Sequence, residues 1–315
     1  NNKNYTYNSQ DKSTYANENI IYNFKKATID LNFKEDNTSS KVVYRKVEVG
    51  QSDVDTNIPK TATKQNSTYA LIIGNEDYSS KQPGLTTEQN VDFAINDAEV
   101  FATYCEKTLG IPKNQIKLLK NATSAEINRG LGWINNLSKI EKGKAKLLFY
   151  YTGHGLPDEK TKEPYIIPVD VSGNDLKYGV KITDVYKSLT EHAAKQITVF
   201  LDACFSGGAR NQGLIAMKGI KVKPKKDIIT GNMVVFSSSS GDESSAVHRE
   251  KQHGFFTYYL LKKLQETKGQ VELNSLGDYI INSVSKETGL DGIIQTPEVN
   301  TSLKVKKYWK EWKLK

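Results

Sequence analysis

Two short stretches of the sequence place a reactive side chain among glycines. His154 lies in the stretch YTGHG, and Cys204 lies in the stretch DACFSG, fifty residues further along the chain. A thiol becomes a strong nucleophile when a neighbouring imidazole takes its proton, and the imidazolium can then protonate the amine that leaves a cleaved peptide. Nearby glycines let the backbone turn sharply and leave its amides accessible to a ligand. The two stretches therefore predict thiol catalysis, with Cys204 as the nucleophile and His154 as general base and acid.

Each reactive residue follows an apolar run that is typical of a buried strand. The runs are 145–152 before His154 and 197–202 before Cys204. Further strand-like runs and amphipathic segments alternate along the chain: strands at 69–74, 115–119 and 233–237, and helices around 91–109, 123–137, 182–192, 255–265 and 273–286. This order predicts an α/β three-layer sandwich, in which helices cover both faces of a mostly parallel central sheet. Active sites in such sheets lie at the carboxyl ends of the strands, where both reactive residues are found.

The first 66 residues differ from the rest, because they are rich in Asn, Thr, Ser, Lys and Tyr. Two alternating runs, 27–33 and 42–49, predict a short β-hairpin, and the stretch 50–67 that follows has the composition of a linker. We therefore divide the chain into an N-terminal extension with a β appendage (1–66), a catalytic domain (67–303) and a basic C-terminal tail (304–315). The extension could cover the active site as a pro-segment or pair its hairpin with a sheet edge.

On these motifs, the sequence resembles the caspase and metacaspase superfamily of cysteine peptidases, especially its bacterial members. YTGHG fits the family's histidine motif, and DACFSG fits the D-x-C-x-S-G motif of metacaspases, where caspases carry Q-A-C-x-G. The interval between the two residues is also that of caspases. Further matches are IIGN at 72–75, NDA at 96–98, FSSS at 236–239, GFFTYYLL at 254–261 and QTP at 295–297. The resemblance covers roughly 69–297 and implies a caspase-like fold, with an oxyanion hole formed by the amides of Gly155 and Cys204.

The resemblance also implies a pocket for the substrate residue before the cut, P1. It is formed by Asp97, Thr152 and Asp202, with Thr152 in place of the family's usual serine. Two carboxylates in one pocket favour a guanidinium or ammonium partner. No Arg lies between Gly74 and Asp97 to bind an acidic side chain, as caspases require. We therefore predict cleavage after Arg or Lys and not after Asp; the alternative is that Asp97 only caps a helix or forms an ion pair within the fold.

The stretch after Cys204 is basic, and the resemblance implies a linker here that the enzyme can cut itself. The candidate positions are Arg210, Lys218, Lys221, Lys223, Lys225 and Lys226. The alternative is a solvated, Lys-rich loop without a processing role.

No cofactor is predicted. Calcium-dependent metacaspases place clustered acids, including adjacent aspartates, after the histidine motif. The acids of the corresponding stretch are scattered here: Asp158, Glu159, Glu163, Asp170, Asp175 and Asp184. Scattered carboxylates do not make an obvious oxygen cage, and the chain carries no nucleotide-binding motif. We expect no metal and no nucleotide requirement, and we expect a monomer, since metacaspases are commonly monomeric.

Composition limits the class of protein. Of the 315 residues, 37% are hydrophobic and 25% are charged, which is typical of a globular protein. No apolar run reaches the ~20 residues of a membrane-spanning helix. With two cysteines a disulfide scaffold is excluded, and Cys105, on an apolar helix stripe, is expected in the core. The net charge of +8 comes from scattered lysines without a nucleic-acid-binding motif, so no nucleic-acid partner is predicted.

Two other functions stay open beside a peptidase with a peptide or protein substrate. One is a caspase-like interaction module that has lost turnover, although Cys204 and His154 are both intact. The other is a thiol hydrolase or transferase acting on a bond other than a peptide. The remaining histidines, His192, His248 and His253, are expected to be structural or exposed. Because the sequence begins with Asn1 and not Met, we expect a start codon, with or without a signal peptide, upstream of it; the compartment stays open.

Overall fold

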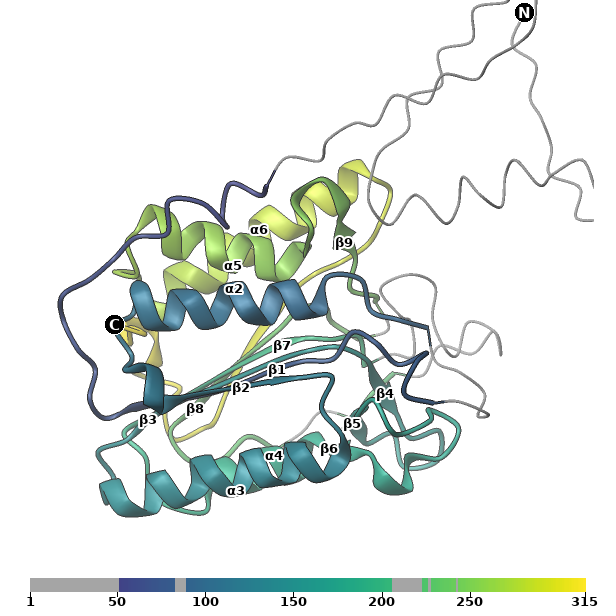
Figure 1. Cartoon of the computed structure of the whole chain (residues 1–315), viewed down its shortest axis with the longest axis horizontal. Helices are drawn as coiled ribbons and strands as arrows, with labels where there is room; N and C mark the ends of the chain where they lie inside the picture. Colours follow the sequence, from purple (N-terminus) through teal and green to yellow (C-terminus); the bar gives the residue numbers. More distant parts are fainter. Residues whose placement is uncertain (1–50, 83–88, 206–222, 226–227, 242) are drawn as a thin grey trace, which may run out of the picture. The chain divides into compact units, whose positions relative to one another are not determined.

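The computed structural model describes residues 51–82, 89–205, 223–225, 228–241 and 243–315 (Figure 1). The predicted N-terminal hairpin, 27–33 with 42–49, lies outside these residues. Residues Ser52–Lys315 form one compact unit. Within the described ranges, no helix is both long and apolar enough to cross a bilayer.

A six-stranded sheet forms the centre of this unit, with the strand order β11-β8-β7-β3-β1-β2. Its strands are β1 (Thr68–Gly74), β2 (Ile116–Lys120), β3 (Lys146–Thr152), β7 (Gln196–Asp202), β8 (Met233–Ser237) and β11 (Glu298–Thr301). Neighbouring strands run parallel, except that the edge strand β11 is antiparallel to β8. The five strands expected from the sequence are all present. The sixth, β11, was not expected, because its residues EVNT have no apolar pattern.

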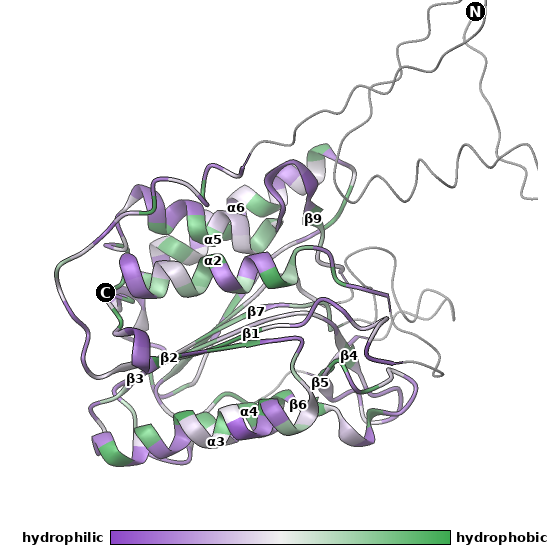
Figure 2. Cartoon of the chain, in the orientation of Figure 1, coloured by the Kyte–Doolittle hydropathy of each residue, from purple (hydrophilic) through white to green (hydrophobic). Residues whose placement is uncertain are grey.

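Helices cover both faces of the sheet (Figure 1). One face carries α2 (Ala94–Lys107), α5 (Phe255–Glu266) and α6 (Leu273–Leu290), and the other carries α3 (Ser124–Glu141) and α4 (Ile182–Thr190). Each face has its own apolar core. Figure 2 shows apolar residues gathered on the strands and on the inner sides of the helices, with polar residues largely outside. The predicted three-layer α/β fold is confirmed.

The central strands are continuous apolar runs because both of their faces are covered. Every residue of β1 and β7 is buried, as expected for parallel strands between two helical layers. Successive side chains enter opposite cores: Phe200 packs in the core under α2 and α5, and Leu201 packs in the core under α3 and α4. This alternation decides on which side of the sheet each residue of the site lies.

Short strands follow His154 and precede α5, and a capping motif begins α3. An antiparallel sheet of β4 (Gly155–Pro157), β5 (Pro164–Ile166) and β6 (Val180–Lys181) starts directly after His154. A two-residue pair, β9 (Val247–His248) with β10 (His253–Gly254), precedes α5. A capping box begins α3: the Thr123 hydroxyl accepts from the Glu126 amide at 3.3 Å, and the Glu126 carboxylate accepts from the Thr123 amide at 2.9 Å.

Residues 52–66, which the composition assigned to a linker, pack closely on the helices in the structure. Val54 is fully buried, and the Tyr104 hydroxyl of α2 donates to its carbonyl at 2.8 Å. The Gln65 side-chain amide donates to the carbonyls of Leu109 and Leu314, at 2.9 and 2.8 Å, and so joins this segment to the C-terminal tail. In that tail, Trp309 is buried as well. Because isolated side chains and main-chain carbonyls make these contacts, the sequence of this segment has no apolar period from which the packing could be predicted.

Candidate active site

His154 and Cys204 follow neighbouring strands at equivalent positions. In the parallel pair of β3 and β7, Thr152 lies opposite Asp202, and each reactive residue comes two positions later. Adjacent strands are about 4.8 Å apart, so the two residues emerge side by side at the carboxyl edge of the sheet. Both are buried, with exposed fractions of 3% for His154 and 4% for Cys204. The structure thus brings together two residues that are fifty positions apart in the sequence.

Gly155 lies against the backbone that carries the thiol. A Cβ atom at this position would lie 2.7 Å from the Phe205 ring and 3.1 Å from the carbonyl oxygen of Cys204. Only glycine therefore fits here. The Ile167 amide donates to the His154 carbonyl at 3.0 Å, and Gly155 faces Ile166, which makes this a non-hydrogen-bonded pair of the β4–β5 ladder. The amide of Gly155 consequently points away from β5, as an oxyanion-hole donor must.

Replacing Gly155 with Ala is expected to displace the Cys204–Phe205 backbone. We expect kcat/KM for peptide hydrolysis to fall about 10- to 100-fold, because small misplacements of reacting groups are costly. Gly132, on α3, provides the matched control, since nothing lies within 4 Å of a Cβ built there. Gly132→Ala should keep full activity in the same fluorogenic assay. Undiminished turnover by Gly155→Ala would contradict the close approach.

Main-chain carbonyls and tyrosines hold His154 in place. Its Nε2 atom lies 2.6 Å from the Gln89 carbonyl oxygen. A carbonyl can only accept, so Nε2 carries the hydrogen, and in the neutral ring Nδ1 is left as the basic nitrogen. The Tyr151 hydroxyl donates to the His154 carbonyl at 2.6 Å, and the His154 amide donates to the Tyr78 hydroxyl at 3.0 Å. The sequence could not indicate Gln89, because a main-chain carbonyl has no side-chain signature.

The Cys204 thiol also has a main-chain partner. Its Sγ atom donates to the Glu243 carbonyl oxygen at 3.2 Å, from the segment that follows β8. The other cysteine, Cys105, is fully buried in the core as expected, and burial raises the pKa of its thiol far above the usual value. Of the two cysteines, only Cys204 follows a strand, β7, whose neighbour β3 is followed by a histidine, His154.

Thr152 and Asp202 lie together on the α2/α5 side of the sheet. They are opposite one another in register, and Tyr150 and Phe200, two positions earlier, pack in the core on this side. The Asp202 carboxylate accepts from the Thr257 hydroxyl at 2.6 Å and from the Thr257 amide at 3.3 Å, in the first turn of α5. Among the described residues, the Thr152 hydroxyl has no hydrogen-bond partner. Both side chains are fully buried.

Asp97, the third predicted pocket residue, meets the same end of α5 from α2. Its two carboxylate oxygens accept from the Gly254 amide at 3.3 and 3.2 Å. The first amides of a helix are unpaired and carry partial positive charge, which stabilises carboxylates placed there. The structure therefore gathers Asp97, Thr152 and Asp202 around the start of α5. It also gives Asp97 the intramolecular contacts that the structural alternative predicted.

His253, expected to be structural, joins three segments of the chain. Its Nδ1 atom lies 2.7 Å from Asp97 and its Nε2 atom 2.8 Å from Asp55, and the side chain is fully buried. Burial by itself lowers the pKa of His253, but the hydrogen bonds to Asp55 and Asp97 outweigh it and raise the pKa to about 9. At neutral pH the ring is therefore an imidazolium between two carboxylates. The sequence missed this cluster because its members are far apart in the chain.

The charge of His253 predicts how stability depends on pH. Its pKa is raised from 6.5 to about 9 on folding, so its contribution is fully present below pH 6.5 and is lost as pH rises through 9. The shift corresponds to roughly 3 kcal/mol. Asp55→Asn should therefore remove much of the decrease in unfolding free energy between pH 6.5 and 9.5, measured by urea denaturation. Asp53→Asn is the control, because Asp53 bonds Lys251 and Lys262 instead of His253. An unchanged pH slope in Asp55→Asn would refute this assignment.

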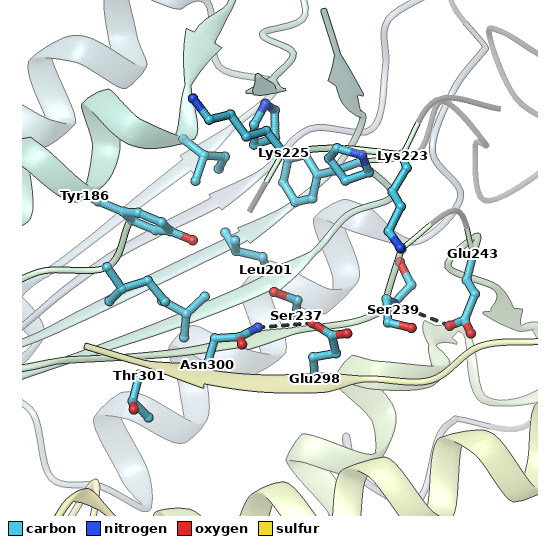
Figure 3. Close-up of a pocket in the computed structure, with 18 residues that line it drawn as sticks. Tyr186, Leu201, Lys223, Lys225, Ser237, Ser239, Glu243, Glu298, Asn300 and Thr301 are labelled. Atoms are coloured by element: carbon cyan, nitrogen blue, oxygen red, sulfur yellow. Dashed lines mark hydrogen bonds between the residues drawn. The ribbon is translucent and has the colours of Figure 1, made fainter. Parts of the chain in front are cut away.

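A cavity of about 440 Å³, lined by Phe205 and by residues of α4, lies on the α3/α4 side of the sheet (Figure 3). Leu201, Tyr186 and Phe205 contribute apolar walls, and Glu243 is among its polar lining residues. Two of the six candidate processing positions, Lys223 and Lys225, also line it. The other four, Arg210, Lys218, Lys221 and Lys226, lie outside the described residues.

Comparisons with known proteins agree with this geometry. A family model, the caspase domain of C14 peptidases, matches residues 67–308. A search of curated protein sequences gives no match. A crystal structure of a Geobacter sulfurreducens protein superposes with a TM-score of 0.56 at 18% identity, covering 78% of this chain and 97% of the other. Caspase-1 from Spodoptera frugiperda gives a TM-score of 0.52 at 14% identity, covering 78% and 92%. At such identities the two structures support the fold alone.

Proposed function

Because the chain belongs to the caspase-domain family of cysteine peptidases, we propose that it hydrolyses peptide bonds with Cys204 as nucleophile and His154 as general base and acid. One observation carries the proposal: the two residues stand at equivalent positions beyond the register pair of Thr152 and Asp202. A thiol and an imidazole in this relation can exchange a proton and act on one carbonyl group.

In the proposed mechanism, the proton of the Cys204 thiol passes to Nδ1 of His154 while Nε2 stays bonded to the Gln89 carbonyl. The sulfur then forms a bond with the substrate carbonyl carbon, and the amides of Gly155 and Cys204 stabilise the oxyanion. The carbon–nitrogen bond breaks as the imidazolium protonates the leaving amine, which leaves a thioester. Water adds to the thioester as His154 takes its proton, and the thiol is released with the proton returned.

We further propose that the pocket selects Arg or Lys at P1. Asp202 and Thr152 supply a buried carboxylate and hydroxyl on the same side of the sheet, and Asp97 adds a second carboxylate. His253 compensates the charge of Asp97, because it lies 2.7 Å away as an imidazolium. Asp202 is therefore the carboxylate that contributes most to binding a P1 cation, with Thr152 as a hydroxyl acceptor.

The test is turnover of matched fluorogenic peptides that end in Arg, Lys or Asp. Release after Arg and Lys, with none after Asp, would support both the chemistry and the pocket. Release after Asp would refute the pocket and leave the Cys–His pair intact. If the folded protein cleaves none of the three peptides, the result would favour the interaction module or an activity on another bond.

Autoprocessing is part of the same proposal. Lys223 and Lys225 line the cavity beside Phe205, the residue after Cys204, which supports cleavage in this region. Incubated wild-type protein should yield two fragments whose new terminus follows a basic residue, as measured by mass spectrometry. Cys204→Ala, incubated alone, should stay intact. Cleavage of the variant at the same rate would assign the cut to another protease.

Calcium independence and a monomeric state stay predictions. The peptide assay with added calcium or a chelator checks the first, and sedimentation at assay concentration checks the second. Stimulation by calcium would contradict the first prediction and make the acidic residues after His154 candidate calcium ligands.

A further inference from the structure

The hydrogen of the Cys204 thiol is bound by a carbonyl from outside its own strand. Sγ donates to the Glu243 carbonyl oxygen at 3.2 Å, and the cysteine is only 4% exposed. A carbonyl oxygen can only accept, so it engages the same thiol hydrogen that would pass to the imidazole during catalysis. Proton transfer to His154 therefore requires that this contact be broken.

The side chain of Glu243 holds its own carbonyl in this place. Its carboxylate accepts from the Thr296 amide at 2.6 Å, the Thr296 hydroxyl at 3.1 Å and the Ser240 amide at 3.3 Å. Three bonds to one partly buried carboxylate, two of them to Thr296, restrict the backbone of Glu243 strongly. The contact on the thiol is thus set by a residue more than ninety positions further along the chain.

Gln295, the residue before Thr296, bonds residues on both sides of Glu243, namely Ser238 and Ala246. Gln295, 1% exposed, accepts from the Ala246 amide at 2.8 Å and donates to the Ser238 carbonyl at 2.9 Å. Ser238 in turn donates through its hydroxyl to the Ala203 carbonyl, next to the thiol, at 3.2 Å. Ser238, Glu243 and Ala246 are therefore all bonded to the chain between α6 and β11.

We propose that Glu243 and Thr296 are positioning residues of the nucleophile: together they keep the Glu243 carbonyl on the Cys204 thiol, where it accepts the thiol hydrogen at rest. A peptide that enters the site must displace this carbonyl before the thiol can pass its proton to His154. The inference rests on the proposed role of Cys204 as the nucleophile, but its test does not depend on peptide turnover.

The test measures alkylation of Cys204 by iodoacetamide, followed by mass spectrometry, at pH 7 and pH 10. Cys204→Ala supplies the blank, since Cys105 is fully buried. In Glu243→Ala the pH 7 rate should rise about threefold to tenfold, because one hydrogen bond to the thiol is lost. At pH 10, where free thiols are mostly ionised, the two proteins should react alike. Glu243→Gln keeps an acceptor oxygen for Thr296 and should restore a rate close to wild type.

Glu298→Ala is the matched control. Glu298 lines the same cavity and carries the same charge as Glu243, but its carboxylate accepts from the Asn300 side-chain amide, at 3.1 Å. Its pH 7 rate should equal that of the wild type. If Glu298→Ala reacts faster to the same degree, the effect comes from the loss of negative charge alone. If Glu243→Ala reacts faster by the same factor at both pH values, the effect comes from easier access of iodoacetamide to the thiol. Either result, or no change in Glu243→Ala, would overturn the proposal.

The peptide assay tests the proposed peptidase function, and the alkylation assay tests the positioning role of Glu243. If Glu243→Ala reacts faster with iodoacetamide while no peptide is cleaved, the positioning role stands and the proposed peptidase function fails. If peptides are cleaved and alkylation is unchanged by the substitution, the function stands and the positioning role fails.

Discussion

Replacing Cys204 with Ala is expected to lower the hydrolysis of Arg and Lys peptides by at least about a thousandfold, because covalent catalysis loses its only nucleophile. Cys204 contributes little to the core beyond its small volume, so the variant should fold normally, as checked by circular dichroism. The measurement is kcat/KM on the same fluorogenic peptides. Activity that persists at more than a few per cent would assign the nucleophile elsewhere.

Two further variants make this prediction specific. Cys105→Ala removes the other thiol, which lies on α2 in the α2/α5/α6 core, and should keep activity while it loses some stability. His154→Ala should also abolish turnover, yet leave Cys204 available to iodoacetamide at pH 10. A His154 variant with normal turnover would refute the pair even if the cysteine variant is silent.

Replacing Asp202 with Asn is expected to lower kcat/KM for an Arg peptide by about tenfold to a hundredfold, because a hydrogen-bonded charge partner of the P1 side chain is lost. A matched peptide with citrulline, which has the shape of Arg without its charge, should be affected much less. The ratio of the two kcat/KM values is therefore the quantity to measure. An unchanged ratio would show that Asp202 acts only in the structure, as a partner of Thr257.

The neighbours of Asp202 provide controls of opposite kinds. Thr257→Val removes the hydroxyl that Asp202 accepts at 2.6 Å, but it keeps the carboxylate, so stability should fall while the Arg-to-citrulline ratio stays the same. Asp97→Asn should change the ratio less than Asp202→Asn does, because His253 already neutralises Asp97. A larger effect at Asp97 would reverse the assignment of the two carboxylates.

His253 has partners that lie far from it in the sequence. A single histidine between Gln252 and Gly254 has no local partner in the sequence, so a structural role was the reasonable expectation. That role is observed, but its chemistry depends on Asp55 and Asp97, which lie 198 and 156 positions away. Contacts of this range have no periodicity, and only the packing of three segments around the start of α5 reveals them.

The sequence by itself determined the order of strands and helices and the place of the two reactive residues. Buried parallel strands are continuous apolar runs, and amphipathic helices repeat every 3.6 residues, so both are legible locally. The carboxyl ends of parallel strands meet at one edge, which is why His154 and Cys204 could be paired without coordinates. The spacing of Thr152 and Asp202 before them likewise fixed their shared face.

The tertiary structure alone decided what surrounds this pair. The carbonyls of Gln89 and Glu243 bind the imidazole and the thiol, and main-chain atoms are common to all residues, so no residue type announces them. The packing of residues 52–66 and the edge strand β11 rest on a few isolated contacts, which leave no apolar period in the sequence. Local patterns encode elements and their ends, whereas the hydrogen-bond partners of His154 and Cys204 come from segments that meet only when the chain has folded.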